Sequence, residues 1–162
     1  PGIDYADINP FALEHPLAPE LAARDAGIEV ALAPILAAHA RLAARVDALV
    51  VEGVGGWAAP LSASLMQADL VRALRLPVVL VVGLRLGCLN HALLSACAIA
   101  ADGLHLAGWI GSHVDPAMAR VEDNLAMLRA RLPAPCWGVL PHAPGADAAA
   151  MARHLRIPVL AS

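Results

Sequence analysis

The chain has 162 residues, of which 59% are hydrophobic and 15% charged, so it can bury a sizeable core and is not disordered. The formal net charge is −3 without any basic stripe, which argues against nucleic acid as the main ligand. No apolar run is long and uninterrupted enough to span a membrane, and no signal-peptide pattern opens the chain. We therefore expect one domain, residues 1–162, in a cytoplasmic protein.

Three cysteines and the absence of lysine limit the chemistry. Cys88, Cys97 and Cys136 lie in apolar runs, which favours reduced core thiols over a disulfide framework. All 11 basic residues other than histidine are arginines. Any mechanism that needs a lysine must therefore take it from outside these residues.

The N-terminal third predicts a loose start followed by a helix. Prolines and polar side chains in the first 27 residues predict irregular chain over a surface. Residues 28–46 predict a helix with Pro34 in its first turns.

Four apolar runs at similar spacing predict parallel strands, at residues 48–52, 77–83, 106–111 and 136–140. The segments between them read as helices, at residues 67–76, 90–101 and 116–131, the last with Asp115 as its cap. A loop is expected at 141–145, a short helix at 147–155, and loose chain at 158–160. Alternating strands and helices favour right-handed crossovers and a three-layer α/β sandwich with a mostly parallel sheet.

A glycine-rich loop follows the first predicted strand. Glu52 ends that strand, and Gly53, Gly55 and Gly56 come directly after it. Ligands of open α/β sheets bind at the carboxyl ends of strands, where such glycines let backbone N–H groups approach a ligand. An acid there is also where phosphate-binding enzymes hold Mg²⁺. A cap and a tight turn would explain the same residues.

Two further stretches follow predicted strands. Residues 83–96 lead into a helix near Asn90, whose free N–H groups can bind a phosphate or a carboxylate, although this stretch alone favours plain helix capping by Asn90. Ser112 and His113 follow the third strand and can face the same edge or solvent. The histidines and cysteines show no metal-binding spacing, and no G-x-S-x-G elbow is present.

Two motifs resemble the signatures of the dethiobiotin synthetase family. Residues 52–57, Glu-Gly-Val-Gly-Gly-Trp, with Pro60-Leu61 behind them, are similar to the first signature. Residues 85–92, Arg-Leu-Gly-Cys-Leu-Asn-His-Ala, are similar to the second. Asn9-Pro10-Phe11, Ala107-Gly108-Trp109 and residues 133–141 fit in the same order, so the resemblance covers residues 3–155.

The resemblance implies an ATP-dependent ligase of biotin biosynthesis with a P-loop NTPase-like α/β fold. Its members convert 7,8-diaminononanoate (diaminopelargonate), CO₂ or bicarbonate and Mg·ATP to dethiobiotin, ADP and phosphate. A carbamate forms on one amine, ATP converts it to a carbamic-phosphoric anhydride, and the second amine closes the ring. The family acts as a cytoplasmic homodimer, without nucleic acid or membrane partners.

The resemblance also implies residue roles. Glu52 would bind Mg²⁺, and the helix N-terminus at residues 87–90 would bind the substrate carboxylate from the partner subunit. The implied substrate-binding residues are Glu52, Gly53, Val54, Gly55, Gly87, Cys88, Leu89 and Asn90. The implied nucleotide-binding residues are Glu52, Gly53, Val54, Gly55, Ser112, His113, Pro141, His142 and Ala143. Cys88 is expected to serve packing or backbone positioning.

The sequence departs from the family pattern in three respects. No G-x-x-x-x-G-K-[ST] loop occurs, so the catalytic lysines are expected N-terminal to Pro1, with no catalytic residue in this segment. Ser112-His113 stands where many members have Asn-Asp near the adenine, and Asn124 stands where one has a substrate-side tyrosine. We expect the 162 residues alone to be inactive.

The phosphate-loop strand is central in P-loop sheets, so its absence would leave two strand edges unpaired. Each unpaired group costs on the order of 1–3 kcal/mol against a total stability of about 5–15 kcal/mol. We therefore expect the natural protein to carry a further N-terminal segment.

Two alternatives remain open from the sequence. One is a non-catalytic truncated relative that binds a small acid or nucleotide, or acts as a dimer partner. The other is a different P-loop relative, such as a ParA-like or cobyrinate amidation enzyme.

Overall fold

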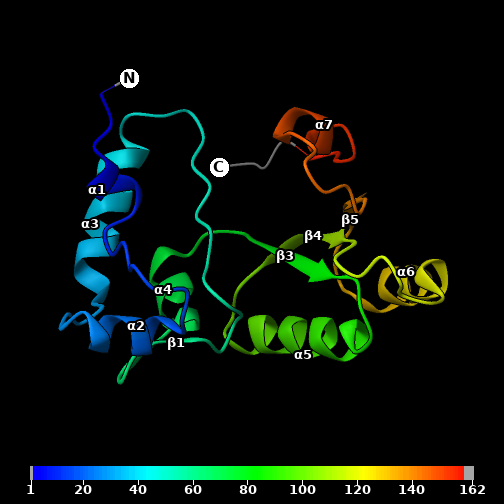
Figure 1. The fold of residues 1–162 in the computed structure, drawn as a ribbon, viewed down its shortest axis with the longest axis horizontal. Helices are drawn as coiled ribbons and strands as arrows, with labels where there is room; N and C mark the ends of the chain where they lie inside the picture. The colour runs from blue at the N-terminus through cyan, green and yellow to red at the C-terminus, as the bar shows by residue number, and fades with distance from the viewer. Residues whose placement is uncertain (1, 159–162) are drawn as a thin grey trace. The chain divides into compact units, whose positions relative to one another are not determined.

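The computed structural model describes residues 2–158, which divide into two compact units, Pro1–Arg75 and Leu76–Ser162 (Figure 1). The single domain expected for residues 1–162 stays a prediction. The loose tail expected at residues 158–160 lies mostly outside the described residues.

The first unit is built from helices and a short hairpin. Its elements are α1 (Tyr5–Ile8), α2 (Pro19–Asp25), α3 (Leu32–Ala43), β1 (Pro60–Ser62), β2 (Leu65–Met66) and α4 (Gln67–Leu74). The prediction of irregular chain over the first 27 residues is therefore wrong in part. Pro19 opens α2, since proline has no N–H to lose in the first turn.

Apolar side chains from α2, β1 and α4 form the core of this unit. Ala23, Val30, Leu61 and Leu70 are buried, and Phe11 of the Asn9-Pro10-Phe11 segment packs against them. The helix predicted at residues 28–46 is confirmed as α3, with Pro34 in its first turn.

Helix α4 begins with a reciprocal cap that involves Asp69. The N–H of Met66 donates to the Asp69 carboxylate (2.7 Å), which also pairs with Arg72. The bond from Met66, and after it Arg72, holds the pKa of Asp69 below its usual value of 3.8. A lowered pKa means that the ionised cap stabilises the fold above pH 3.8 and that this contribution disappears as pH falls through the lowered pKa.

An Asp69→Asn variant is therefore expected to melt below the wild type at pH 7. The difference should shrink at an acidic pH well below 3.8, where the Asp69 carboxylate becomes protonated. Circular dichroism melts at the two pH values measure this difference. A difference that stays constant with pH would contradict the role of the ionised cap.

The second unit carries a parallel sheet with strand order β3-β4-β5. Its elements are β3 (Val78–Gly83), α5 (Cys88–Ala101), β4 (Leu106–Ser112), α6 (Val121–Arg131), β5 (Cys136–Leu140) and α7 (Ala148–Ala152). Three of the four predicted strands are confirmed with nearly the expected bounds. The short helix expected at residues 147–155 is confirmed as α7, capped by Asp147.

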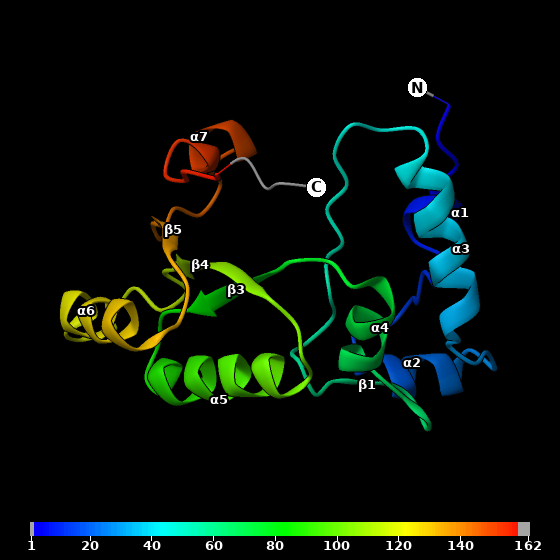
Figure 2. The same ribbon diagram turned by 180° about the vertical axis from the view of Figure 1, so that it is seen from behind.

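The two longer helices of this unit lie on the same face of the sheet. Strands β3, β4 and β5 follow one another in space as in sequence, so right-handed crossovers place α5 and α6 on one side. Helix α5 contacts β3, β4 and α6 (Figures 1 and 2). The expected α/β architecture with a parallel sheet is thus confirmed.

The strand predicted at residues 48–52 is wrong, because these residues belong to no helix or strand. Val50 is 91% exposed, and no described strand pairs with the segment. An apolar run becomes a buried strand only where a neighbouring strand bonds its backbone and a layer covers its side chains.

Helix α6 starts later than predicted, at Val121 instead of Pro116. Arg120 adopts a left-handed conformation (φ 59°), which interrupts a helix. Asp115 still accepts a hydrogen bond from the N–H of Ala117 (2.9 Å), but it caps a turn and not the helix.

Tryptophans pack on both faces of the sheet. Trp109 is fully buried in β4. The ring of Trp137 covers Gly108 so closely that a methyl group there would lie 2.2 Å from it. The pairing shifts between Trp109 and Ile110 as Trp137 enters an extra position in β5, and such a bulge re-aims a side chain.

Candidate functional site

The carboxyl ends of the three strands meet at one edge of the second unit's sheet. Gly83 pairs with Ser112, and Ser112 pairs with Leu140. The loops that follow these strands therefore start side by side, as expected for a ligand-binding edge of a parallel sheet.

His113 and His142 lie together at this edge. The N–H of His113 donates to the carbonyl of Leu140 (3.0 Å). The His142 Nδ1 lies 3.2 Å from the His113 carbonyl oxygen, which can only accept, so Nδ1 carries the hydrogen. The two rings meet edge to face with centroids 6.5 Å apart. The His113 Nε2 is buried without a hydrogen-bond partner among the described residues.

The turn between β3 and α5 depends on Gly87. Gly87 is the N-terminal cap of α5 and has φ 93°, a conformation that side chains disfavour. The N–H of Cys88 donates to the carbonyl of Arg85 (3.0 Å). The expected capping by Asn90 is wrong: Asn90 lies in the first turn, and none of the described side chains caps α5. The helix starts two residues earlier because glycine allows the turn.

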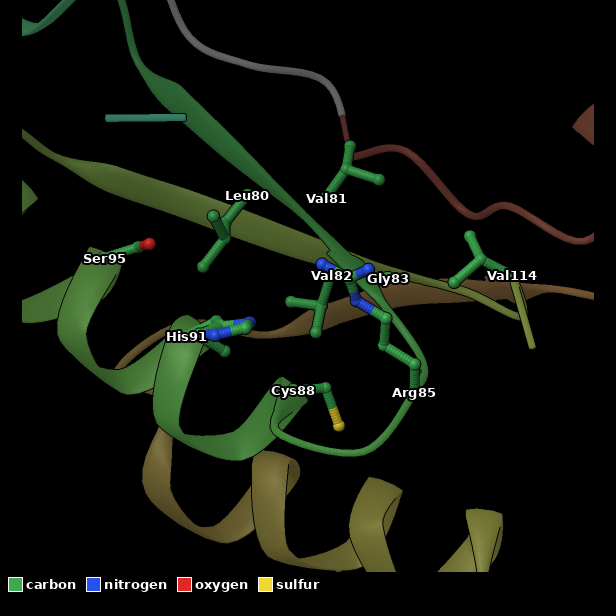
Figure 3. A pocket seen from close by; sticks show the side chains of 10 residues that line it. Leu80, Val81, Val82, Gly83, Arg85, Cys88, His91, Ser95 and Val114 are labelled. Carbon is green, nitrogen blue, oxygen red and sulfur yellow. The ribbon is translucent and has the colours of Figure 1, made fainter. Parts of the chain in front are cut away.

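A cavity of about 390 Å³ lies between β3 and the first half of α5 (Figure 3). Leu80 and Val82 point toward the helix, and His91 and Ser95 face the strand from α5. The Arg85 side chain turns back along the end of β3 toward Gly83. The cavity thus combines an apolar wall with Arg85, Cys88, His91 and Ser95, groups that suit a small acidic ligand.

The glycine-rich loop of the first unit is fastened to α4. The first two N–H groups of that helix donate to the carbonyls of Ala59 (2.8 Å, from Gln67) and Trp57 (3.1 Å, from Ala68). Gly55 adopts φ 76°, which requires glycine. Glu52, Gly53 and Val54 precede this anchored part and are exposed, so their backbone and the Glu52 carboxylate are accessible.

The described residues include no group of three or more His, Cys, Asp or Glu side chains that can hold a metal ion. Mg²⁺ is commonly bound through one or two carboxylates, with phosphate oxygens and waters as the other ligands. The exposed Glu52 carboxylate fits a Mg²⁺ site of this kind, in which phosphate oxygens and waters supply the remaining ligands.

The structure thus groups the expected residues into three sets. Within the second unit, Ser112, His113 and His142 come together at the sheet edge, with Pro141 and Ala143 beside His142 in sequence. Gly87, Cys88, Leu89 and Asn90 form the start of α5. The third set, Glu52, Gly53, Val54 and Gly55, lies in the first unit.

Sequence reasoning missed two features of these sites. Arg85 and His91 belong to the motif at residues 85–92, but only the structure shows that both side chains line a cavity. Gln67 is buried against Gly53, and no sequence pattern indicates that contact because the two positions are far apart in the chain.

No described helix has the length and apolar character needed to cross a membrane. Cys88, Cys97 and Cys136 are free thiols, but the expectation that all three lie in the core is wrong: Cys88 is buried, Cys136 is half-buried and Cys97 is exposed.

Comparison with known proteins gives consistent matches over nearly the whole chain. A family model described as AAA domain matches residues 2–150. A protein of Xanthomonas euvesicatoria pv. vesicatoria (strain 85-10) is 64% identical over 158 residues, which are 98% of this chain and 70% of that protein. A protein of Xanthomonas campestris pv. campestris (strain 8004) is 61% identical with the same coverage. A Xylella fastidiosa (strain 9a5c) protein is 61% identical over 152 residues, 93% of this chain and 67% of that protein. All three are named ATP-dependent dethiobiotin synthetase BioD.

Proposed function

Because the chain belongs to the dethiobiotin synthetase family, we propose that it acts on 7,8-diaminononanoate, CO₂ and Mg·ATP through the three residue sets described above. It is an ATP-dependent ligase of biotin biosynthesis with a P-loop NTPase-like α/β fold. A non-catalytic relative and other P-loop enzymes, the alternatives from the sequence, are not favoured by this membership.

The nucleotide base lies at the sheet edge beside His113 and His142 in this proposal. The register that joins Gly83, Ser112 and Leu140 supports it, since three loops begin there together. Ser112, Pro141 and Ala143 complete this set.

The substrate carboxylate binds at the start of α5 in the same proposal. Gly87, Cys88, Leu89 and Asn90 form the positive end of the helix dipole, although the N–H of Cys88 already donates to the carbonyl of Arg85. Cys88 is 2% exposed, which supports a packing role. A homodimer, in which each subunit's α5 serves its partner's site, follows the family pattern, and sedimentation of the purified protein measures it.

Glu52 and the backbone of Gly53, Val54 and Gly55 face the phosphates and the substrate amines. When bound, Mg²⁺ neutralises charge that develops on the transferred phosphoryl group. The Glu52 carboxylate would hold that ion, and the exposed glycine backbone would approach the ligands. We also propose a cytoplasmic location, which the three free thiols support.

A Gly87→Ala variant tests the substrate-carboxylate assignment. The methyl group is strained at φ 93° and lies 3.6 Å from His91 Cε1, so we expect a loss of about 1 kcal/mol in stability. The KM for diaminononanoate should rise about tenfold, as expected when one contact worth 1.4 kcal/mol is lost. Gly103→Ala is the matched control, because Gly103 has φ 72°, lies beyond the other end of α5 and has no atoms within 4 Å of the added methyl. An equal KM change in both variants would contradict the assignment.

Genetic complementation tests the overall function. The complete gene, introduced into a bacterium that lacks its own dethiobiotin synthetase, should restore growth without biotin or dethiobiotin. Growth on dethiobiotin but not on diaminononanoate would show that the introduced gene product does not convert diaminononanoate to dethiobiotin.

A further inference from the structure

Gln67 is a buried polar side chain to which the reaction assigns no role. It is the first residue of α4 and is 7% exposed, although it carries a long amide. Burying an amide is costly unless it is used in packing or hydrogen bonding, so the position of Gln67 requires a physical reason.

The Gln67 amide lies directly beneath Gly53. A methyl group added to Gly53 would lie 2.6 Å from the Gln67 Nε2 and 3.1 Å from its Cδ. These distances are shorter than ordinary contacts between carbon and a neighbouring side chain. The Gly53 backbone therefore rests on the amide at a separation that only glycine allows.

The backbone of Gln67 holds the other end of the same loop. Its N–H donates to the carbonyl of Ala59 (2.8 Å), and the next N–H, from Ala68, donates to Trp57 (3.1 Å). The loop from Gly53 to Ala59 is thus supported at its start by the side chain of Gln67 and at its end by the N-terminus of α4. Glu52 is the residue immediately before the supported segment.

We propose that Gln67 is a positioning residue that fixes Gly53 and thereby the direction of the Glu52 carboxylate. The inference rests on the proposed function, in which Glu52 holds Mg²⁺ with the nucleotide. Removal of a group that contacts and orients a metal ligand typically lowers metal affinity or activity by about 10–100-fold. Gln67 acts through Glu52 and touches neither metal nor substrate.

The first test measures metal binding in the purified full gene product. Gln67→Ala should raise the half-saturating Mg²⁺ concentration at fixed ATP by about tenfold, with a smaller change in kcat at saturating Mg²⁺. The affinity for Mn²⁺ with ADP bound, followed by electron paramagnetic resonance, should fall by a similar factor. Gln67→Met keeps the length of the side chain and should restore both values to within about twofold.

The second test is a double-mutant cycle in melting temperature without metal or nucleotide. Gly53→Ala and Gln67→Ala should each lower the melting temperature by about 3 °C. The double variant should melt near either single variant, because the added methyl occupies space that the amide leaves. Gly56→Ala is the matched control for stability, since no atom lies within 4 Å of its added methyl, and should shift melting by about 1 °C or less.

Two outcomes would overturn the proposal. In the first, Gln67→Ala lowers the melting temperature but leaves the metal affinity unchanged. That result would show that Gln67 has a structural role alone. The other is strict additivity of Gly53→Ala and Gln67→Ala in melting. If Gln67→Ala does not fold, Gln67→Asn replaces it, and unchanged metal affinity in that variant overturns the proposal equally.

Failure of the proposed function would be distinguishable. A wild-type protein without dethiobiotin formation would refute the function, whereas the melting cycle reports the contact between Gln67 and Gly53 independently of any reaction.

Discussion

Replacing Glu52 by glutamine is expected to lower kcat/KM for dethiobiotin formation by about a hundredfold, the usual cost of one group that stabilises developing charge. Glutamine keeps the shape of the side chain and removes its charge, so the exposed loop should fold as before. The half-saturating Mg²⁺ concentration should rise in parallel, because a neutral amide is a weaker ligand for a hard cation. Steady-state assays across a Mg²⁺ titration measure both quantities.

Glu29→Gln is the matched control for this change. Glu29 is exposed in the same unit and lies outside the three residue sets, so it loses the same charge at a site without a proposed role. Its kinetic constants should equal those of the wild type. A Glu52→Gln enzyme with an unchanged Mg²⁺ dependence would exclude Glu52 as the metal ligand, whatever its effect on kcat.

Truncating Trp109 to alanine is expected to cost about 3–5 kcal/mol of unfolding free energy, a large part of the 5–15 kcal/mol typical of a whole protein. Trp109 is fully buried in the central strand of the second unit, and its neighbours on β5 can close only part of the space. Urea unfolding followed by circular dichroism measures the loss. Since β4 leads directly to Ser112 and His113, the variant should also inactivate at lower temperature.

Trp109→Phe separates cavity formation from loss of the indole. The indole N–H of Trp109 is buried without a partner among the described residues, so phenylalanine removes an unsatisfied donor while it keeps most of the packing. We expect a cost of about 1–2 kcal/mol. Equal losses for Phe and Ala would contradict the account in which the cost of Trp109→Ala comes from the space that the ring leaves.

The sheet of the second unit was predictable because its sequence signals are local and repeated. Residues 78–83, 106–112 and 136–140 are short apolar runs bounded by turns, and each pairs with a neighbour inside the same unit. Their common edge, and the meeting of Ser112 with Leu140 there, followed from parallel pairing alone. The contact between His113 and His142 did not, since it depends on how two loops fold back.

The first unit shows the opposite case. Residues 48–52 have the composition of a buried strand. A strand forms only where a second strand pairs with it, and the local sequence pattern does not identify that partner strand. The helices α1 and α2 were missed because they are short and lie among prolines, although Pro19 suits a first helical position. The left-handed backbone of Gly87 and the contact between Gln67 and Gly53 could not be predicted from the sequence, because both depend on the folded backbone.

The central claim is that this chain's protein forms the ureido ring of dethiobiotin. The most direct measurement incubates the purified full gene product with 7,8-diaminononanoate, ATP, Mg²⁺ and ¹³C-bicarbonate and follows products by mass spectrometry. The account predicts dethiobiotin that carries one ¹³C atom in its ureido carbon, with one ADP formed per ring. ATP hydrolysis without labelled dethiobiotin, or no reaction under conditions in which the protein is folded, would contradict it.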